Sequence, residues 1–370
     1  MKIVFSSNIS WSIYNFRTPL LKSLQKDGHI IYTVASKDKY ADKLIDEGFF
    51  FDEVKLNNNS KNPFEDIKLV FQYYNLYKKI KPDVICHNAI KPNIYGTIAA
   101  KFLGIPVVNN ISGLGTLFIK ESLSTKIAKF LYKVSQRKAD KVFFQNTEDY
   151  QEFLKNNLVK EGICEIIPGS GVNTELFIPK KNEERMLFRF IFIGRLLFDK
   201  GILEYIKALR ILKKKYSNFE GTMLGPIYQS NNTAITEENL KEWIKEGVVN
   251  YLGITDNIVE FMQEADCLVL PSYREGLSKV LIEASSVGVP IITTNVPGCK
   301  DVVVNEVTGL LCEAKNVNDL AMKMEEMLNY DEKKRKEMGL NARKRAIAFF
   351  DEKIIINQYK NAINKVVKNS

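Results

Sequence analysis

The stretch CLVLPSYREGLSKVLIEASSVGVPIITTN, residues 267–295, contains one complete strand–helix–strand unit. CLVLPS is a short apolar run of strand length, YREG is a turn, KVLIEASSVG has the length and period of a helix, and PIITTN is a second strand. A strand that is apolar throughout is buried on both faces, as strands of parallel sheets are. The stretch therefore predicts a parallel α/β architecture.

The same alternation of strand and helix continues in both directions along the chain. In the first half the expected strands are residues 2–7, 29–36, 83–87, 106–112, 141–145 and 164–168. In the second half they are residues 189–194, 221–225, 248–253, 267–272, 290–295 and 309–312. The pattern predicts two Rossmann-like, doubly wound domains that face a central cleft, with ligands bound outside the carboxyl ends of the strands.

A segment rich in glycine, proline and charge, near residues 169–187, separates the two sets of strands. Such a composition is typical of a domain junction. We therefore expect an N-terminal domain over residues 1–172 and a C-terminal domain over residues 173–351. The final segment, residues 352–370, is expected to form a helix that packs back onto the N-terminal domain.

Composition restricts the function classes. The 370 residues carry a net charge of +9, which is compatible with nucleic acid, an anionic membrane or a phosphorylated substrate as partner. Five scattered cysteines without a CxxC pair indicate a reducing compartment. The apolar run at the N-terminus is too short for a signal peptide, and no run approaches the roughly 18 apolar residues that cross a bilayer. We expect a soluble or peripheral protein.

The sequence disfavours metal and dinucleotide chemistry. His29 and His87 are the two histidines, too few for an HExxH or His-rich zinc site, and no aspartate is followed by another two positions later. We therefore expect no metal and no cofactor, although carboxylates that could hold a divalent ion remain. Gly113 and Gly115 begin a GxGxxG pattern, but Phe118 stands at the third glycine position, so nicotinamide or flavin binding is disfavoured.

The stretch RFIFIGRLLFDKG, residues 189–201, places two cations after a predicted strand that ends at Gly194. Arg195 and Lys200 lie in a turn that closes at Gly201. Arginine offers a bidentate fork and lysine a point charge, so the two together suit one diphosphate. The alternative is a pair of solvated surface charges, and the spacing alone favours neither reading.

One glutamate, Glu275, lies in the YREG turn, and a second, Glu283, lies in the predicted helix that follows it. Ser278 is expected to cap the following helix, so that backbone N–H groups from Gly276 to Lys279 attract phosphate. Glu275 would accept hydrogen bonds from sugar hydroxyls, and Glu283 from the vicinal hydroxyls of a ribose. For two such glutamates in isolation, the alternative is favoured, in which Glu283 faces solvent and Glu275 braces the turn.

In combination, these motifs resemble the retaining glycosyltransferases of family 4, which have the GT-B architecture. The E-x7-E motif of the family matches Glu275 and Glu283, and its phosphate-binding pair matches Arg195 and Lys200. The stretches IIPGSGVNTELFIP, VTGLLCEAKNVNDLA and FDEKIIINQYKNAI are also similar to the family, so that the resemblance covers nearly the whole chain. It implies a metal-independent transferase that takes a sugar from a nucleotide donor, a UDP-sugar by expectation, with retention of configuration.

The resemblance also implies roles for single residues. The expected catalytic residues are Arg195, Lys200 and Glu275, of which the cations stabilise the diphosphate leaving group and the glutamate positions the sugar. The expected donor-binding residues on the C-terminal domain are Gly194, Tyr251, Gly276, Leu277, Ser278, Lys279, Val280 and Glu283.

The N-terminal half resembles a narrower group. SIYNFRTPLLKSL and GLGTLF are similar to bacterial enzymes that extend undecaprenyl-diphosphate-linked sugars, closest to the N-acetylgalactosaminyltransferases among them. A lipid-diphosphate acceptor would then bind here, with Arg17 pairing its diphosphate; the alternative is that Arg17 pairs with a nearby carboxylate. The expected acceptor-binding residues are Asn8, Tyr14, Arg17, Lys91, Ser112 and Gly113.

One departure from the family pattern concerns a histidine. Many members have a His-Gly step where this chain has Ser112-Gly113, so whatever that histidine does for the donor hexose is done otherwise here. His87 is not its equivalent. We expect His87 to be a structural residue at the edge of the cleft, and only in second place a substrate contact.

Residues 120–141 predict a basic amphipathic helix. Cations that share one helix face are Lys126, Lys129, Lys133 and Arg137, and the apolar stripe beside them is Ile127, Phe130, Leu131 and Val134. Such a helix is typical of a membrane-surface element, and the alternative is a core-packed helix with a solvated basic side. Nucleic acid is disfavoured as a partner because no binding motif appears.

The expected function is transfer of a sugar, an N-acetylhexosamine among the candidates, from a UDP-sugar to an undecaprenyl-diphosphate-linked acceptor. The enzyme would act in the assembly of a surface polysaccharide or glycoprotein glycan, in the cytoplasm and peripherally at the inner face of a bacterial membrane. The alternatives are a sugar-nucleotide epimerase of the same architecture and a non-catalytic nucleotide-sugar binder.

Overall fold

The computed structural model describes residues 1–56, 63–114, 123–180, 186–228, 231 and 233–369. The chain divides into two compact units. Unit 1 comprises Met1–Ser170 and Glu352–Ser370, and unit 2 comprises Gly171–Asp351. The first unit is therefore completed by the C-terminal end of the chain.

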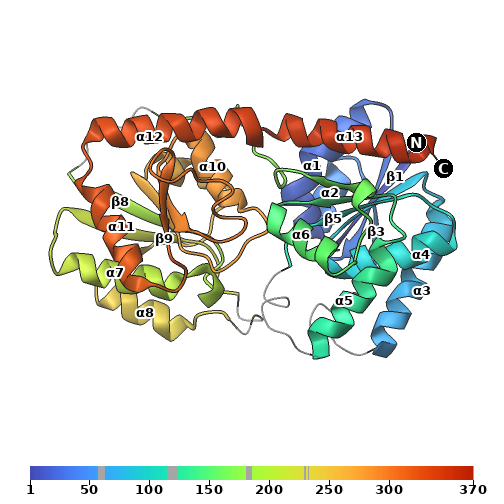
Figure 1. Ribbon diagram of the computed structural model, residues 1–370, viewed down its shortest axis with the longest axis horizontal. Helices are drawn as coiled ribbons and strands as arrows, with labels where there is room; N and C mark the ends of the chain where they lie inside the picture. The colour runs from blue at the N-terminus through green and yellow to red at the C-terminus, as the bar shows by residue number, and fades with distance from the viewer. Residues whose placement is uncertain (57–62, 115–122, 181–185, 229–230, 232, 370) are drawn as a thin grey trace. The chain divides into compact units, whose positions relative to one another are not determined.

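Unit 1 is built on a seven-stranded sheet in which neighbouring strands run parallel (Figure 1), in the order β3-β2-β1-β4-β5-β6-β7. Its strands are β1 (Lys2–Ile9), β2 (Ile30–Ser36), β3 (Phe50–Glu53), β4 (Val84–Asn88), β5 (Val107–Ile111), β6 (Lys141–Phe144) and β7 (Cys164–Ile166). The sequence did not predict β3. Its residues, FFDE, lie at the edge of the sheet, where a strand needs no continuous apolar run.

Helices cover both faces of this sheet. They are α1 (Ser10–Lys26), α2 (Tyr40–Asp46), α3 (Pro63–Ile80), the π-helix η1 (Pro92–Gly96), α4 (Thr97–Phe102), α5 (Leu123–Gln136), α6 (Thr147–Lys155), the short 3-10 helix η3 (Glu161–Ile163) and α13 (Glu352–Lys368). Side chains alternate along β1, so Ile3 and Phe5 pack with α1 and α13, whereas Val4 packs with α3, α4 and α5. Figure 1 shows α13, in red, alongside α1, which it contacts.

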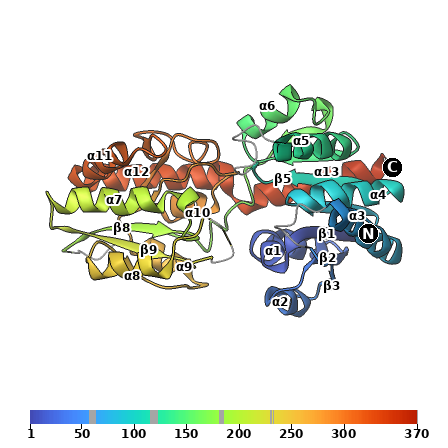
Figure 2. The same cartoon turned by 90° about the horizontal axis from the view of Figure 1, so that it is seen from below.

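Unit 2 is built on a six-stranded parallel sheet with the order β10-β9-β8-β11-β12-β13. Its strands are β8 (Phe188–Ile193), β9 (Phe219–Leu224), β10 (Asn250–Tyr251), β11 (Cys267–Leu270), β12 (Ile291–Thr294) and β13 (Gly309–Cys312). Its helices are η4 (Phe198–Lys200), α7 (Ile202–Lys213), α8 (Glu237–Lys245), α9 (Ile258–Gln263), α10 (Lys279–Val287), α11 (Val317–Asn329), α12 (Glu332–Arg345) and η5 (Ala346–Phe350). Figures 1 and 2 both show α7 beside α11, which it contacts.

The predicted class of two doubly wound, Rossmann-like α/β domains is confirmed. In unit 2 the strand expected over residues 248–253 is limited to Asn250–Tyr251. Parallel strands end at one edge of a sheet, so the segments that follow β8 and β11 meet there. Within the described part of the chain, no helix is both long and apolar enough to cross a membrane.

Candidate functional site

Two turns meet at the strand ends of unit 2, and a glycine lets them touch. Gly201, which lies between η4 and α7, has a φ of 76°, and a Cβ atom there would lie 2.1 Å from the carbonyl oxygen of Pro271. A side chain would therefore disrupt both the left-handed backbone and the packing. The turn after β8 is thereby held against the turn after β11, although the two are far apart in the sequence.

The contact brings a predicted cation onto a predicted carboxylate. The Lys200 ammonium forms an ion pair with Glu275, and the Ser272 hydroxyl donates to the same Glu275 oxygen over 2.7 Å. Both side chains of the pair are largely buried, at 20% and 13% exposure. Arg195, which also follows β8, is exposed and has no carboxylate partner among the residues that the structure describes. One of the two expected diphosphate cations is thus paired within the protein.

The turn that carries Glu275 is also fixed from its other side. The backbone N–H groups of Glu275 and Ser278 donate to the carbonyl oxygens of Pro297 and Gly298, over 3.1 and 3.0 Å. Gly298 has a φ of 78°, and a Cβ atom there would lie 2.4 Å from the Glu275 carbonyl oxygen. The position of the Glu275 backbone therefore depends on two neighbouring segments rather than on the turn alone.

The expectation that Ser278 caps the next helix is wrong. Ser278 occupies the N-cap position of α10, but its side chain makes no capping hydrogen bond. Its ψ is 110°, whereas Thr236, whose hydroxyl does cap α8, has a ψ of 161°. The Ser278 N–H, expected to be open to phosphate, is used by Gly298. We attribute the difference to this backbone bond, which holds the residue away from the usual cap geometry.

Glu283 lies inside unit 2, which excludes the solvent-facing alternative. The residue is 5% exposed, and its Oε1 lies 3.7 Å from the ammonium of Lys279. Burial raises the pKa of the Glu283 carboxyl to about 7, and the nearby lysine opposes that shift. A carboxyl group poised near neutrality at this position can donate as well as accept hydrogen bonds.

The other residues expected to bind the donor lie around the same two turns. The Tyr251 hydroxyl donates to the carbonyl oxygen of Gly225 over 2.9 Å, so it braces the turn after β9. Leu277 and Val280 are partly buried against the core of unit 2. Gly194 and Gly276 are half-buried beside them.

In unit 1, Arg17 is buried without a carboxylate. The residue is 4% exposed, and its Nε and Nη2 donate to Asn88 Oδ1 over 3.2 and 2.9 Å. Its guanidinium lies 5.1 Å from the centre of the Tyr359 ring, on α13. No ion pair joins Arg17 to an acid in the described ranges, so the carboxylate alternative is not supported there. Asn8 Oδ1 is also buried and accepts no hydrogen bond from a described residue.

The remaining residues expected to bind the acceptor have different environments. Tyr14 packs against Tyr40, with the ring centres 5.4 Å apart. Lys91 pairs with Asp66 over 3.1 Å, so its charge is compensated. Ser112 is exposed and Gly113 half-buried. Gly115 and Phe118, on which the rejected dinucleotide pattern rests, lie outside the described residues.

The expectation that His87 lies at the edge of a cleft is wrong. Its side chain is fully buried in β4, with Asn109 Oδ1 2.9 Å from Nδ1 and the Tyr77 hydroxyl 2.9 Å from Nε2. Burial lowers the pKa of His87 to about 4, which keeps the imidazole neutral. A Cβ atom on Gly96 would lie 2.4 Å from His87 Nε2. His87 is therefore a structural group of the unit 1 interior.

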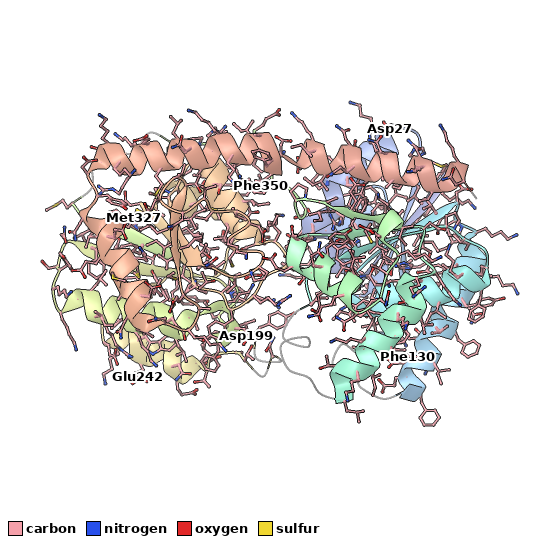
Figure 3. The ribbon with its side chains drawn as sticks, in the orientation of Figure 1. Asp27, Phe130, Asp199, Glu242, Met327 and Phe350 are labelled. Carbon is pink, nitrogen blue, oxygen red and sulfur yellow. The ribbon has the colours of Figure 1, made fainter. Side chains whose placement is uncertain are left out.

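The basic helix is present as α5, and its apolar stripe is divided. Leu131 packs against the core, whereas Ile127 and Phe130 are exposed, Phe130 by 64% (Figure 3). Of the predicted cations, Lys129 lies 3.5 Å from Glu152. The exposed cations are Lys126, Lys133 and Arg137.

Sequence reasoning missed a second pair that joins the two turns of unit 2. The Tyr273 hydroxyl donates to Glu204 Oε1 over 2.8 Å, and the Tyr273 N–H donates to the Asp199 carbonyl oxygen over 2.9 Å. A signal was present, because Glu204 interrupts the apolar run ILEYI at the start of α7. Its partner could not be found from spacing, since the two residues are 69 positions apart.

Comparison with known proteins assigns this arrangement to a family. The family model described as "Glycosyl transferases group 1" matches residues 173–345, and the model described as "Glycosyl transferase 4-like" matches residues 2–146. The chain is 32% identical, over 100% of both chains, to the N,N'-diacetylbacillosaminyl-diphospho-undecaprenol alpha-1,3-N-acetylgalactosaminyltransferase of Campylobacter jejuni. It is 28% identical to the capsular polysaccharide biosynthesis glycosyltransferase CapM of Staphylococcus aureus, over 83% of each chain.

Among solved structures, Anabaena HepE in complex with UDP and glucose is similar in fold. Its TM-score is 0.82 at 18% identity, with 98% of this chain and 99% of that chain covered. The two sheets, the turns at their strand ends and both family matches agree, and the chain belongs to the group 1 glycosyltransferases, with the GT-B fold.

Proposed function

We propose that this glycosyltransferase moves a sugar from a UDP-sugar to a lipid-diphosphate-linked acceptor, with retention of configuration and without a metal. The observation that carries the proposal is the Lys200–Glu275 ion pair, which joins the turns after β8 and β11 in unit 2, where Arg195 and the buried Glu283 also follow those strands. A full-length relative named for a diphospho-undecaprenol substrate supports the acceptor class, and a structure in complex with UDP and glucose supports the donor class.

The donor diphosphate would bind at the two cations. Negative charge builds on the diphosphate as the glycosidic bond breaks, so contacts from Arg195 and Lys200 strengthen in the transition state. Lys200 must exchange its Glu275 partner for a phosphate oxygen to do so. The exchange releases the Glu275 carboxylate, which can then accept hydrogen bonds from hydroxyls of the sugar. One ion pair in the free enzyme thus supplies both a leaving-group contact and a sugar contact.

Glu283 would hold the ribose of the donor. A carboxylate has two acceptor oxygens, which suits two vicinal hydroxyls. Because the pKa of this buried carboxyl is raised to about 7, part of the enzyme carries it protonated at neutral pH. The ionised form accepts from both hydroxyls, so donor affinity should rise as pH increases through that range.

The acceptor diphosphate would bind on unit 1, at Arg17. Its guanidinium is buried without an acidic partner and is oriented by Asn88, so an anion brought to it would meet little competing negative charge. Asn8 precedes α1, the helix that carries Arg17, and its buried side-chain oxygen accepts no hydrogen bond from a described residue. Asn8 would therefore be a second polar contact for the acceptor.

Unit 1 would also attach to the anionic inner face of a bacterial membrane. The exposed cations of α5 would each contribute about 1 kcal/mol near an anionic leaflet. Exposed apolar side chains lie at helical spacing in α5 and also in α3, which packs on the same core cluster; they are Leu123, Ile127, Phe130, Phe64, Ile67 and Phe71. Apolar side chains flanked by lysines are typical of a helix that lies in the membrane interface.

The test incubates the protein with a panel of UDP-sugars, with and without synthetic lipid-diphosphate acceptors, and measures UDP release. Release that requires an acceptor supports transfer. An isomerised sugar nucleotide without acceptor would identify an epimerase, and binding of UDP-sugar without any turnover would identify a binder. Either result would overturn the proposed function.

A further inference from the structure

A hydrogen-bonded pair of a half-buried tyrosine and a buried glutamate, Tyr273 and Glu204, joins the donor turns and does not include Arg195 or Lys200. Glu204, in the first turn of α7, is 9% exposed and accepts a hydrogen bond from the Tyr273 hydroxyl on Oε1, over 2.8 Å. Its second oxygen, Oε2, is buried and accepts no hydrogen bond within the described part of the chain. Glu204 is thus a carboxylate held inside unit 2 by one phenol.

Stability does not explain this glutamate. A buried carboxylate with an unsatisfied oxygen is unfavourable, and an apolar side chain of similar size would pack there without that cost. The residues on either side, Leu203 and Tyr205, already pack against the core. The pair must therefore serve another purpose than filling the interior.

The pair fixes the turn from which Glu275 projects. Tyr273 lies two residues before Glu275, and its own N–H donates to the Asp199 carbonyl oxygen, next to Lys200. The hydroxyl bond to Glu204 adds a second link between the same two segments, separate from the Lys200–Glu275 ion pair. Burial and the neighbouring carboxylate raise the pKa of Tyr273, so the phenol stays protonated and keeps donating.

We propose that Glu204 and Tyr273 are positioning residues, which hold the Glu275 carboxylate where it meets the hydroxyls of the donor sugar. The proposal rests on the proposed function of Glu275. Neither residue contacts the donor. Their link does not involve Lys200, so it persists when Lys200 leaves Glu275 for the diphosphate, and it then holds the turn together with the backbone bonds to Asp199, Pro297 and Gly298.

The experiment compares Tyr273→Phe, Glu204→Leu and the double variant. Each single change removes one partner of the hydrogen bond and leaves the other partner in or at the edge of the protein interior without it, so each should lower the midpoint of urea unfolding. The double variant removes both groups, and stability should return toward that of the unmodified enzyme. The Tyr273–Glu204 hydrogen bond is absent in all three variants, but stability is expected to recover only in the double variant. The double variant therefore separates an effect on stability from an effect on positioning.

Turnover should not recover with stability. We expect kcat to fall about 100-fold in both single variants and in the double variant, as for a misplacement of about 1 Å, while UDP affinity by calorimetry changes less than about threefold. Glu204→Gln, whose amide oxygen can still accept from Tyr273, should keep most of the turnover. A double variant with both stability and kcat restored would overturn the proposal.

Tyr330 provides the matched control. Its hydroxyl also donates to a carboxylate, Glu326, in the same unit but outside both donor turns. Tyr330→Phe should leave kcat unchanged, and an equal loss there would show that the effect is not specific to the turn.

A second measurement separates this proposal from the proposed function. If the unmodified protein transferred no sugar at all, the proposed function would fail, and crystal structures would then decide the positioning claim. A Glu275 carboxylate displaced by about 1 Å or more in the double variant supports it, at the misplacement that costs turnover. An unmoved carboxylate refutes it.

Discussion

Glu275→Gln should make the protein bind UDP more tightly while it transfers sugar more slowly. In the free protein, Glu275 holds the ammonium that the proposed mechanism assigns to the diphosphate. Glutamine has nearly the same shape but no charge, so Lys200 would be free to bind a phosphate oxygen. The glutamine would hold the sugar less well, which lowers turnover.

The magnitude follows from the environment of the pair. At contact distance and an effective dielectric constant of about 20, the Coulomb attraction is roughly 4 kcal/mol. Desolvation and loss of side-chain freedom offset most of it, so that a partly exposed pair contributes on the order of 1 kcal/mol. UDP binding should therefore become about fivefold tighter. Turnover with a UDP-sugar should fall by roughly 100-fold if the sugar is misplaced.

Isothermal titration calorimetry with UDP measures the affinity, and release of UDP in the presence of acceptor measures turnover. Glu220→Gln is the matched control, because Glu220 pairs with Arg189 in the same unit over 2.6 Å and at similar exposure. The control should change neither quantity. A UDP affinity that is unchanged or weaker in Glu275→Gln would refute the reasoning, since Lys200 would then not be restrained by Glu275.

Further changes test other parts of the account. Arg195→Ala should lower turnover by roughly 100- to 1000-fold, since it removes a donor to a developing oxyanion; a near-normal rate would exclude that role. Activity should persist in excess EDTA, and complete loss that Mg²⁺ or Mn²⁺ restores would contradict metal independence. Neutralising Lys126, Lys133 and Arg137 should abolish binding to anionic liposomes, and salt should weaken it in the unmodified protein; parent-like binding would make α5 an ordinary solvated helix. His87 is neutral when folded, with its pKa lowered to about 4 from 6.5, so the unfolded state binds more protons between these values. The free energy of unfolding should fall by about 3 kcal/mol from pH 6.5 to pH 4 through this group; an unfolding curve of His87→Gln that keeps this pH dependence would refute the assignment.

Much of the fold could be predicted from the sequence because its strands are apolar runs. Burial on both faces of a parallel sheet leaves a local signal that does not depend on which strands pair. The edge strand β3 lacks that signal, since half of its residues are the acids Asp52 and Glu53 and the strand is only partly buried. The length of the two-residue strand β10 was overestimated for the opposite reason. Its apolar neighbours Val248 and Val249 are buried in the core, but they lie before the strand and do not pair in the sheet.

The contacts among the candidate site residues could not be predicted from the sequence. The combined motifs after β8 and β11, through their resemblance to the family, selected Arg195, Lys200 and Glu275, whereas spacing alone did not, and the Lys200–Glu275 pair joins residues 75 positions apart. The environment of His87 was misjudged because its burial depends on where its strand lies in the sheet. That strand, β4, lies between β1 and β5 in the interior of the sheet. The role of Ser278 was misjudged because a tertiary bond to Gly298 replaced a local cap.

The central claim is that this chain adds a sugar from a UDP donor to a lipid-diphosphate acceptor through the strand-end cations of unit 2. Mass spectrometry of the acceptor lipid, after incubation with a panel of UDP-sugars, measures this directly. We expect a mass increase of one sugar with the unmodified protein and almost none with the Arg195→Ala/Lys200→Ala double variant. An acceptor that gains no sugar from any UDP donor, or that gains it equally with the double variant, would contradict the claim.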